Sequence, residues 1–150
     1  MYLSGQEIVE IATVKALMNA KHAVIAAGGG GIPVVRREGK LVGVPAVIDK
    51  DFASALLARL IDADMLIILT AVEQVAVNFG TPQQRGLAVL SPDEARAYIG
   101  QGQFAPGSML PKVEAAISFA ESKRGRVALI TRLDKARDGL EGKTGTRIEM

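Results

Sequence analysis

Residues 51–70, DFASALLARLIDADMLIILT, contain a predicted helix followed closely by a predicted strand. Apolar side chains in residues 51–61 recur at helical spacing and share one face; they are Phe52, Leu56, Leu57 and Leu60. Residues 65–70 are an apolar run without polar alternation, which is typical of a strand buried on both faces. This pair of elements predicts an α/β fold.

Similar elements alternate along the rest of the chain. Buried strands are predicted at residues 23–27, 75–79 and 127–131, and a possible edge strand at residues 146–149. Turn residues between positions 32 and 47 predict a hairpin or excursion, and residues 83–89 are expected to form a loop.

Capping patterns mark the starts of the other helices. Ser4-Gly5-Gln6-Glu7 matches a capping box and predicts a helix over residues 5–20. Ser91-Pro92-Asp93-Glu94 combines a serine N-cap, proline at the first helical position and acids in the first turn, so a helix begins there. A further helix is expected from Pro111 to about Ser122, and a short one over residues 133–140.

Strands that alternate with helices predict a mostly parallel sheet with helices on both faces. No repeat, low-complexity tract or obvious linker divides residues 1–150, so a single α/β domain is expected. In such sheets, ligands bind at the carboxyl ends of the strands. Here those ends are the loops after residues 27, 70 and 47.

Composition excludes several classes of function. The chain has no cysteine and only one histidine, His22, so disulfides, thiolate metal sites and multi-histidine metal sites are excluded. A net charge of +2 and few aromatic residues argue against nucleic-acid binding. Apolar runs are too short to cross a bilayer and no signal peptide is evident, so no membrane association and a cytoplasmic location are expected.

A glycine run, comprising Gly28, Gly29, Gly30 and Gly31, follows the predicted strand at residues 23–27. Without Cβ atoms, its backbone N–H groups can face an anion at close approach. The run does not match the G-x-x-x-x-G-K-[ST] fingerprint and does not open a helix, because Ile32 and Pro33 follow it. Contact with an anion or substrate and a plain strand-to-strand turn both fit the pattern.

The sequence Asp49-Lys50-Asp51 lies where an irregular segment meets a predicted helix. A helix N-terminus attracts phosphate through its free N–H groups and its dipole, and Lys50 would add a full positive charge. Asp51 could hold lysines in place or cap the helix. The alternative interpretation is that Asp49 or Asp51 is only an N-cap and that Lys50 is solvated.

Two later segments could contact a nucleotide. Lys112 falls in the first turn of a predicted helix, where a positive charge opposes the helix dipole, so a bound anion would relieve the conflict. A snorkelling surface lysine is the alternative. Residues 70–78 follow a buried strand and carry few charges, so they could line an adenine pocket or simply connect two strands.

Five stretches together resemble carbamate kinases, members of the amino-acid kinase superfamily. They are residues 8–11 (IVEI), 25–34 (IAAGGGGIPV), 47–51 (VIDKD), 104–116 (FAPGSMLPKVEAA) and 142–146 (GKTGT). The resemblance covers nearly all of the chain but only the C-terminal, nucleotide-binding half of a family about twice as long. It implies an amino-acid kinase-like fold and the interconversion of ATP and carbamate with ADP and carbamoyl phosphate, using Mg²⁺ borne by the nucleotide.

The resemblance also implies roles for individual residues. Lys50 and Lys112 match the lysines that contact the transferred phosphoryl group, and Asp51 matches the aspartate that organises them. Gly28–Gly31 resembles the turn on the substrate side. The implied nucleotide pocket consists of Thr70, Ala71, Val72, Val77, Asn78, Pro106, Gly107, Ser108, Met109 and Lys112. No protein ligand for a metal is implied.

The family's N-terminal half carries a Gly-Gly-Asn turn and a protruding subdomain with another lysine, and neither is found here. A kinase that needs a complementary N-terminal half is therefore expected, with a homo-oligomer as the other possible assembly. Part of the sheet would also be absent, and the strand edge left open is expected to pair with a partner. Two alternatives remain, a non-catalytic module that binds ATP or ADP and a truncated relic.

Overall fold

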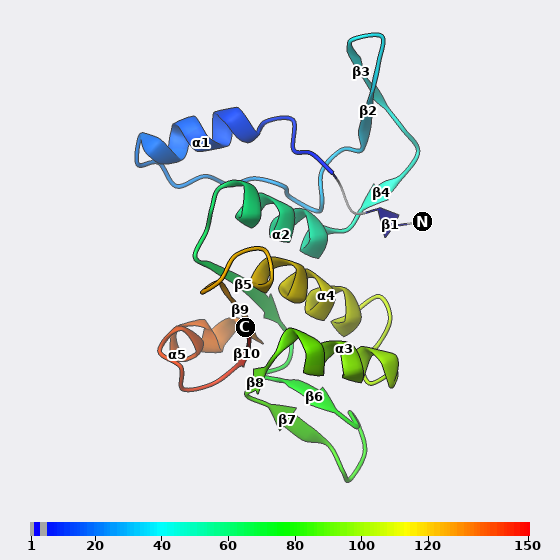
Figure 1. Cartoon of the computed structure of the whole chain (residues 1–150), viewed down its shortest axis with the longest axis vertical. Coiled ribbons are helices and arrows are strands. Elements are labelled where there is room, and N and C mark those ends of the chain that lie inside the picture. Colours follow the sequence, from blue (N-terminus) through cyan, green and yellow to red (C-terminus); the bar gives the residue numbers. More distant parts are fainter. Residues whose placement is uncertain (1, 4–5) are drawn as a thin grey trace. The chain divides into compact units, whose positions relative to one another are not determined.

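The structure is a computed structural model that describes residues 2, 3 and 6–150. Its internal contacts divide the chain into two compact units, Met1–Asp62 and Ala63–Met150, which are described one at a time (Figure 1). The expectation of a single domain over residues 1–150 stays a prediction. No helix in the described part of the chain is long and apolar enough to cross a membrane.

The described residues of the first unit form two helices and two small sheets. The helices are α1 (Ile11–Asn19) and α2 (Lys50–Leu60), and β1 (Tyr2–Leu3) pairs in parallel with β4 (Val47–Ile48). Strands β2 (Val34–Arg37) and β3 (Lys40–Gly43) form the expected hairpin. Its two turn residues, Glu38 and Gly39, both have positive φ, which suits the right-handed twist of a tight hairpin.

Two predictions for the first unit are wrong. The helix expected over residues 5–20 begins only at Ile11, and the Glu7 carboxylate pairs with Arg36 at 3.3 Å instead of capping a helix. Ser4 and Gly5 of the proposed capping box lie outside the described residues. Residues 23–27 do not form a strand, and Ile25 is fully exposed at 101%. An apolar run becomes a strand only when another strand pairs with it.

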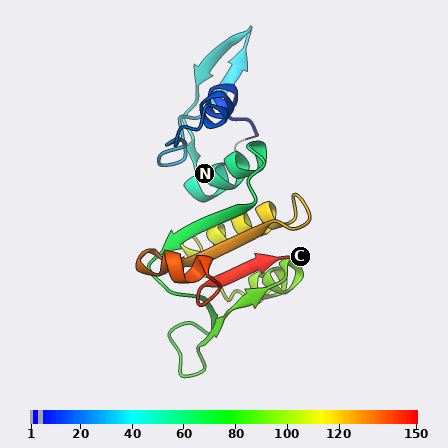
Figure 2. The ribbon, with the colours of Figure 1, turned by 90° about the vertical axis from the view of Figure 1, so that its left-hand side faces the viewer.

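The second unit is a mixed sheet covered by helices. Its sheet has the order β5 (Met65–Thr70), β9 (Val127–Arg132), β10 (Thr146–Glu149), β8 (Val89–Leu90). Pairs β5–β9 and β8–β10 are parallel, whereas β9–β10 is antiparallel. Figure 2 shows α4 (Met109–Ala120) behind this sheet and α5 (Ala136–Leu140) in front of it. The predicted α/β class, with a largely parallel sheet between helices, is confirmed.

The core of the second unit lies between the sheet and α4. Its fully buried side chains include Val113 and Phe119 from α4 and Ile130 and Ile148 from the sheet, whereas the buried Leu129 lies on the other face of the sheet, against Gly139 of α5. Helix α3 (Pro92–Gly100) begins as predicted, because the Ser91 hydroxyl accepts from the Glu94 N–H at 3.2 Å and Glu94 accepts from the Ser91 N–H at 2.9 Å. Ala95 on this helix is completely buried.

Other boundaries in the second unit differ from the expectations. Residues 83–89 are not only a loop, because β7 (Arg85–Leu87) pairs antiparallel with β6 (Val75–Val77). The predicted strand at 75–79 ends at Val77, and residues 133–140 are a 3-10 turn (Leu133–Lys135) followed by α5. The predicted edge strand, β10, is internal because β8 pairs with its outer side.

Candidate active site

The glycine run and the start of α2 lie against each other in the first unit. Gly30 is buried and has a φ of +131°. A Cβ on Gly30 would lie 2.0 Å from the carbonyl oxygen of Ile48 and 3.3 Å from the backbone nitrogen of Lys50. The backbone of this turn therefore reaches the first residue of α2 in a way that only glycine permits.

The start of α2 combines a cap, a cation and a buried carboxylate. Asp49 Oδ1 accepts from the N–H groups of Asp51 at 2.8 Å and Phe52 at 3.3 Å, so Asp49 is the N-cap. Lys50 Nζ lies 3.4 Å from Asp51 Oδ2. The Lys50 side chain is 57% exposed and that of Asp51 only 8%. Asp51 thus anchors a cation that remains open to solvent at a helix N-terminus.

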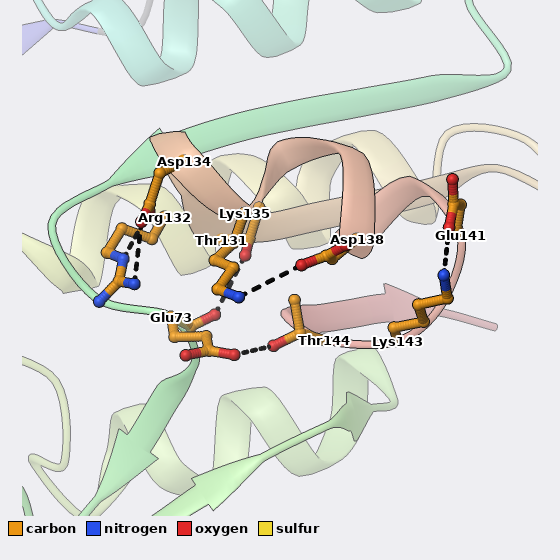
Figure 3. Close-up of polar contacts among 9 residues, drawn as sticks. All are labelled: Glu73, Thr131, Arg132, Asp134, Lys135, Asp138, Glu141, Lys143 and Thr144. Carbon is orange, nitrogen blue, oxygen red and sulfur yellow. Dashed lines mark hydrogen bonds and ion pairs between the residues drawn. The ribbon is translucent and has the colours of Figure 1, made fainter.

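The carboxyl ends of β5 and β9 lie side by side in the second unit, because these strands pair in parallel up to Thr70 and Arg132. The segment after β5 is tied to β9 and to the connection between α5 and β10 by two threonines (Figure 3). The Thr131 hydroxyl donates to the Glu73 carbonyl oxygen at 3.2 Å, and the Thr144 hydroxyl donates to Glu73 Oε1 at 2.5 Å. The segment containing Thr70, Ala71 and Val72 is therefore held at the edge where ligands bind in parallel sheets.

A third threonine supports the same segment from β10. The completely buried Thr146 hydroxyl accepts from the Val75 N–H at 2.8 Å and donates to the Leu87 carbonyl oxygen at 2.5 Å. Gln74 Nε2 also donates to the Gly145 carbonyl oxygen at 3.1 Å. These long-range bonds hold β6, and with it Val77, at a fixed position beside β10.

Asn78 connects the two segments predicted to line a nucleotide pocket. Its N–H donates to Gln103 Oε1 at 2.8 Å, and its φ is +52°. Gln103 directly precedes buried Phe104, where the second segment begins. The structure therefore brings residues 70–78 into contact with the neighbourhood of residues 104–112.

Helix α4 starts two residues earlier than predicted, at Met109 instead of Pro111. The preceding turn is closed by the Ala105 carbonyl oxygen, which accepts from Ser108 N–H at 3.3 Å and Leu110 N–H at 3.1 Å. Pro106, Gly107 and Ser108 are exposed in this turn. Lys112 is half-buried in the first turn of α4, which contains no acidic residue.

An ion pair marks the end of β9. Arg132 Nε lies 2.5 Å from Asp134 Oδ1, and the hydrogen bond lowers the pKa of Asp134 while it raises the pKa of Arg132. Lys135 and Asp138 pair at 3.3 Å in the adjacent turn (Figure 3). No group of three or more His, Asp or Glu side chains that could hold a metal ion occurs among the described residues.

Sequence reasoning missed the residues that hold the candidate site in place. Sequence patterns do not mark Gln103 or Glu73, Thr144 enters only through the resemblance, and Thr146 also begins the edge strand predicted at residues 146–149. Each acts through contacts with residues at least 25 positions away, so no local pattern reveals its hydrogen-bond partner. Thr146 alone carried a signal, as a hydroxyl on a predicted strand.

Comparison with known proteins defines the family. The model of the amino acid kinase family matches residues 3–131 of this chain. The chain belongs to the amino acid kinase family. The matched range includes Gly28–Gly31, Lys50, Asp51, Thr70–Asn78 and the segment through Lys112.

Carbamate kinases are prominent among the family members similar to this chain. The carbamate kinase-like protein YqeA of Escherichia coli is 62% identical over 142 residues, which are 95% of this chain and 46% of that protein. The carbamate kinase of Clostridium perfringens is 52% identical over 95% of this chain and 45% of its own length. The structure of carbamate kinase from Giardia lamblia bound to AMP-PNP superposes with a TM-score of 0.91 and 45% identity, over 95% of this chain and 45% of that one.

The chain spans about half the length of the curated relatives it matches. Within that half, similarity extends over both units described above. The family assignment therefore covers the glycine run, the start of α2 and the two segments linked through Asn78.

Proposed function

We propose that this chain is the nucleotide-binding half of a carbamate kinase-type phosphotransferase. The complete enzyme would interconvert ATP and carbamate with ADP and carbamoyl phosphate. The observation that carries the proposal is the cluster at the start of α2, where Asp51 anchors Lys50 beside the Gly30 backbone. A cation, a helix N-terminus and a close backbone turn suit a phosphoryl group.

Phosphoryl transfer demands little covalent chemistry from the protein. The bond between the γ-phosphorus and the β,γ-bridging oxygen of ATP breaks, and a carbamate oxygen forms a new bond to the same phosphorus. Negative charge on the equatorial oxygens is stabilised by positioned cations. We assign this task to Lys50 and Lys112, with Asp51 holding Lys50 at 3.4 Å.

We assign the nucleotide to the second unit. Residues Thr70, Ala71, Val72, Val77 and Asn78 lie at or follow the carboxyl end of β5, and Pro106, Gly107, Ser108, Met109 and Lys112 form the turn into α4. The bond between Asn78 and Gln103 supports a single pocket built from both segments. The AMP-PNP complex of the Giardia lamblia relative supports the same ligand class.

We assign Gly28, Gly29, Gly30 and Gly31 to the substrate side of the reaction. Mg²⁺ is proposed to arrive with the nucleotide phosphates, where it would neutralise charge on the β- and γ-oxygens. The oxygen-rich phosphates are ligands that Mg²⁺ prefers.

We further propose that activity requires residues equivalent to the remainder of the full-length relatives. Apolar side chains of the first unit remain exposed, with Ile25 at 101% and Ile32 at 85%. Burial of these side chains against a partner would be favourable, because it would remove apolar surface from water. A complementary half of the kinase is the proposed partner, and a second copy of this chain is the alternative.

The proposal is tested by reconstitution. The chain is mixed with the part of the Clostridium perfringens carbamate kinase that it does not match, and ATP formation from ADP and carbamoyl phosphate is followed. We expect activity only in the mixture, and Lys50→Ala should abolish it while Lys40→Ala on β3 should not. Activity that persists in the Lys50→Ala mixture would contradict the assignment of Lys50.

A non-catalytic ADP- or ATP-binding module is the second candidate, favoured by the placement of both proposed nucleotide segments in the second unit, where the Asn78–Gln103 bond joins them. The same experiment separates the two functions. Saturable nucleotide binding with no turnover in any mixture would support the binding module.

A further inference from the structure

One side chain outside both proposed nucleotide segments joins them. Gln103 lies between the end of α3 and Phe104. Its N–H donates to the Tyr98 carbonyl oxygen at 3.1 Å, which fixes the residue to α3. Its Oε1 accepts from the Asn78 N–H at 2.8 Å. Gln103 thus connects the end of β6 with the residue that opens the second segment.

A parallel contact involves the partner strand of β6. An Nη of Arg85, on β7, donates to the Tyr98 hydroxyl at 3.2 Å. The Tyr98 ring packs edge-on against Phe104, with 6.5 Å between ring centroids. Phe104 is only 4% exposed, so this end of the second segment is anchored in the core. Both strands of the β6–β7 hairpin are therefore attached to the C-terminal end of α3.

The bond to Gln103 acts on a residue with an uncommon backbone conformation. Asn78 has a φ of +52°, a region that asparagine tolerates better than most residues and that surrounding contacts must maintain. The Gln103 acceptor fixes the direction of the Asn78 N–H. Loss of this acceptor should therefore alter the turn that contains Asn78.

We propose that Gln103 is a positioning residue that couples the Asn78 turn to the Phe104–Lys112 segment, so that both face one nucleotide. Gln103 acts through the Asn78 backbone and is assigned no contact with the nucleotide. The identification of the ligand as a nucleotide rests on the proposed function, whereas the coupling between the two segments does not.

The test compares three variants of the full chain. Gln103→Met keeps the side-chain length and removes the acceptor, and Gln103→Glu keeps an oxygen acceptor. Gln84→Met is the matched control, because Gln84 Oε1 accepts from the Gly80 N–H at 2.8 Å within the 78–85 loop. Mg·ADP binding is measured by calorimetry, and amide hydrogen exchange is measured without ligand.

Gln103→Met should weaken Mg·ADP binding at least fivefold. It should also accelerate amide exchange at least tenfold at Asn78 and at Ser108 and Leu110, whose N–H groups bond to the Ala105 carbonyl oxygen. Gln103→Glu should restore slow exchange at all three amides. Gln84→Met should change binding less than twofold. If Gln103→Met does not fold, Gln103→Asn, whose acceptor is one methylene shorter, replaces it.

If amide exchange at Ser108 and Leu110 is unchanged in Gln103→Met, the proposed coupling is wrong, whether or not this variant binds ADP. Equal effects of Gln84→Met and Gln103→Met would also overturn it, because loosening anywhere in the loop would then suffice. A wild-type chain that binds no Mg·ADP contradicts the proposed nucleotide site instead, and the exchange data still decide the coupling.

Discussion

Gly30 packs directly against Ile48, and no side chain fits between them. A Cβ on Gly30 would lie 2.0 Å from the Ile48 carbonyl oxygen, a distance that forces the backbone to move. The φ of +131° at Gly30 is also unfavourable for any residue with a side chain. This contact sets the glycine run beside Lys50.

Gly30→Ala should therefore destabilise the first unit by at least about 2 kcal/mol, from the combined clash and backbone strain. Amide exchange of α2 measures this loss. Gly29→Ala is the control, because nothing lies within 4 Å of its Cβ position and its φ is not in the left-handed region. Equal losses in the two variants would show that the Ile48 contact is not the cause.

Asp49→Ala should destabilise α2 by about 1 kcal/mol, because the N–H groups of Asp51 and Phe52 lose their acceptor. Asp49→Ser should retain most of the stability, since serine is also a good N-cap. Amide exchange in the first turn of α2 is the measurement. A loss in Asp49→Ser as large as in Asp49→Ala would contradict the capping role.

Thr146→Val should destabilise the second unit by about 2–3 kcal/mol although the side-chain volume is nearly unchanged. Its hydroxyl serves both the Val75 N–H and the Leu87 carbonyl oxygen in a completely buried position. Urea unfolding measures the change. Thr144→Val, at a half-buried position, should lower the free energy of unfolding by less. A larger loss in Thr144→Val than in Thr146→Val would contradict the role of Thr146 in connecting β6 with β10.

The pairing of Glu121 with Arg96 predicts a pH-dependent stability. The hydrogen bond from Arg96 lowers the pKa of Glu121. Because the pKa is lower in the folded state, the pair contributes its full stability above the unfolded-state pKa of about 4.3. This stability is lost as the pH falls through the folded-state pKa. Glu121→Gln should therefore unfold at lower urea than wild type at pH 7, and the difference should shrink progressively as the pH falls below about 4.3. A constant difference across that range would contradict the linkage.

The sequence predicted those elements whose signals are local. Helix α3 was predicted from Ser91-Pro92-Asp93-Glu94, because both bonds of its capping box form within four residues. Helix α2 and strands β5 and β9 followed from periodicity and apolar runs. The candidate residues Lys50 and Asp51 were found because they flank a helix start.

Features that depend on partners distant in sequence were not predictable in the same way. Residues 23–27 have a strand-like composition, but the described residues provide no strand that pairs with them. Strand β10 looked like an edge, whereas β8 pairs with its outer side. Gln103 is an unremarkable polar residue until the fold brings the Asn78 N–H to it.

The proposed function depends above all on nucleotide binding through the turn into α4 and Lys112. Calorimetric titration with Mg·ADP tests it most directly, with Lys112→Ala and Lys123→Ala measured in parallel. Lys123 lies in the exposed turn after α4, so it controls for the loss of one positive charge in the same unit.

We expect saturable binding by wild type, weakened at least about tenfold by Lys112→Ala, as befits a charged hydrogen bond to phosphate. Lys123→Ala should change the affinity less than twofold. A cooperatively folded chain that shows no saturable binding, or equal affinity in wild type and Lys112→Ala, would contradict the claim.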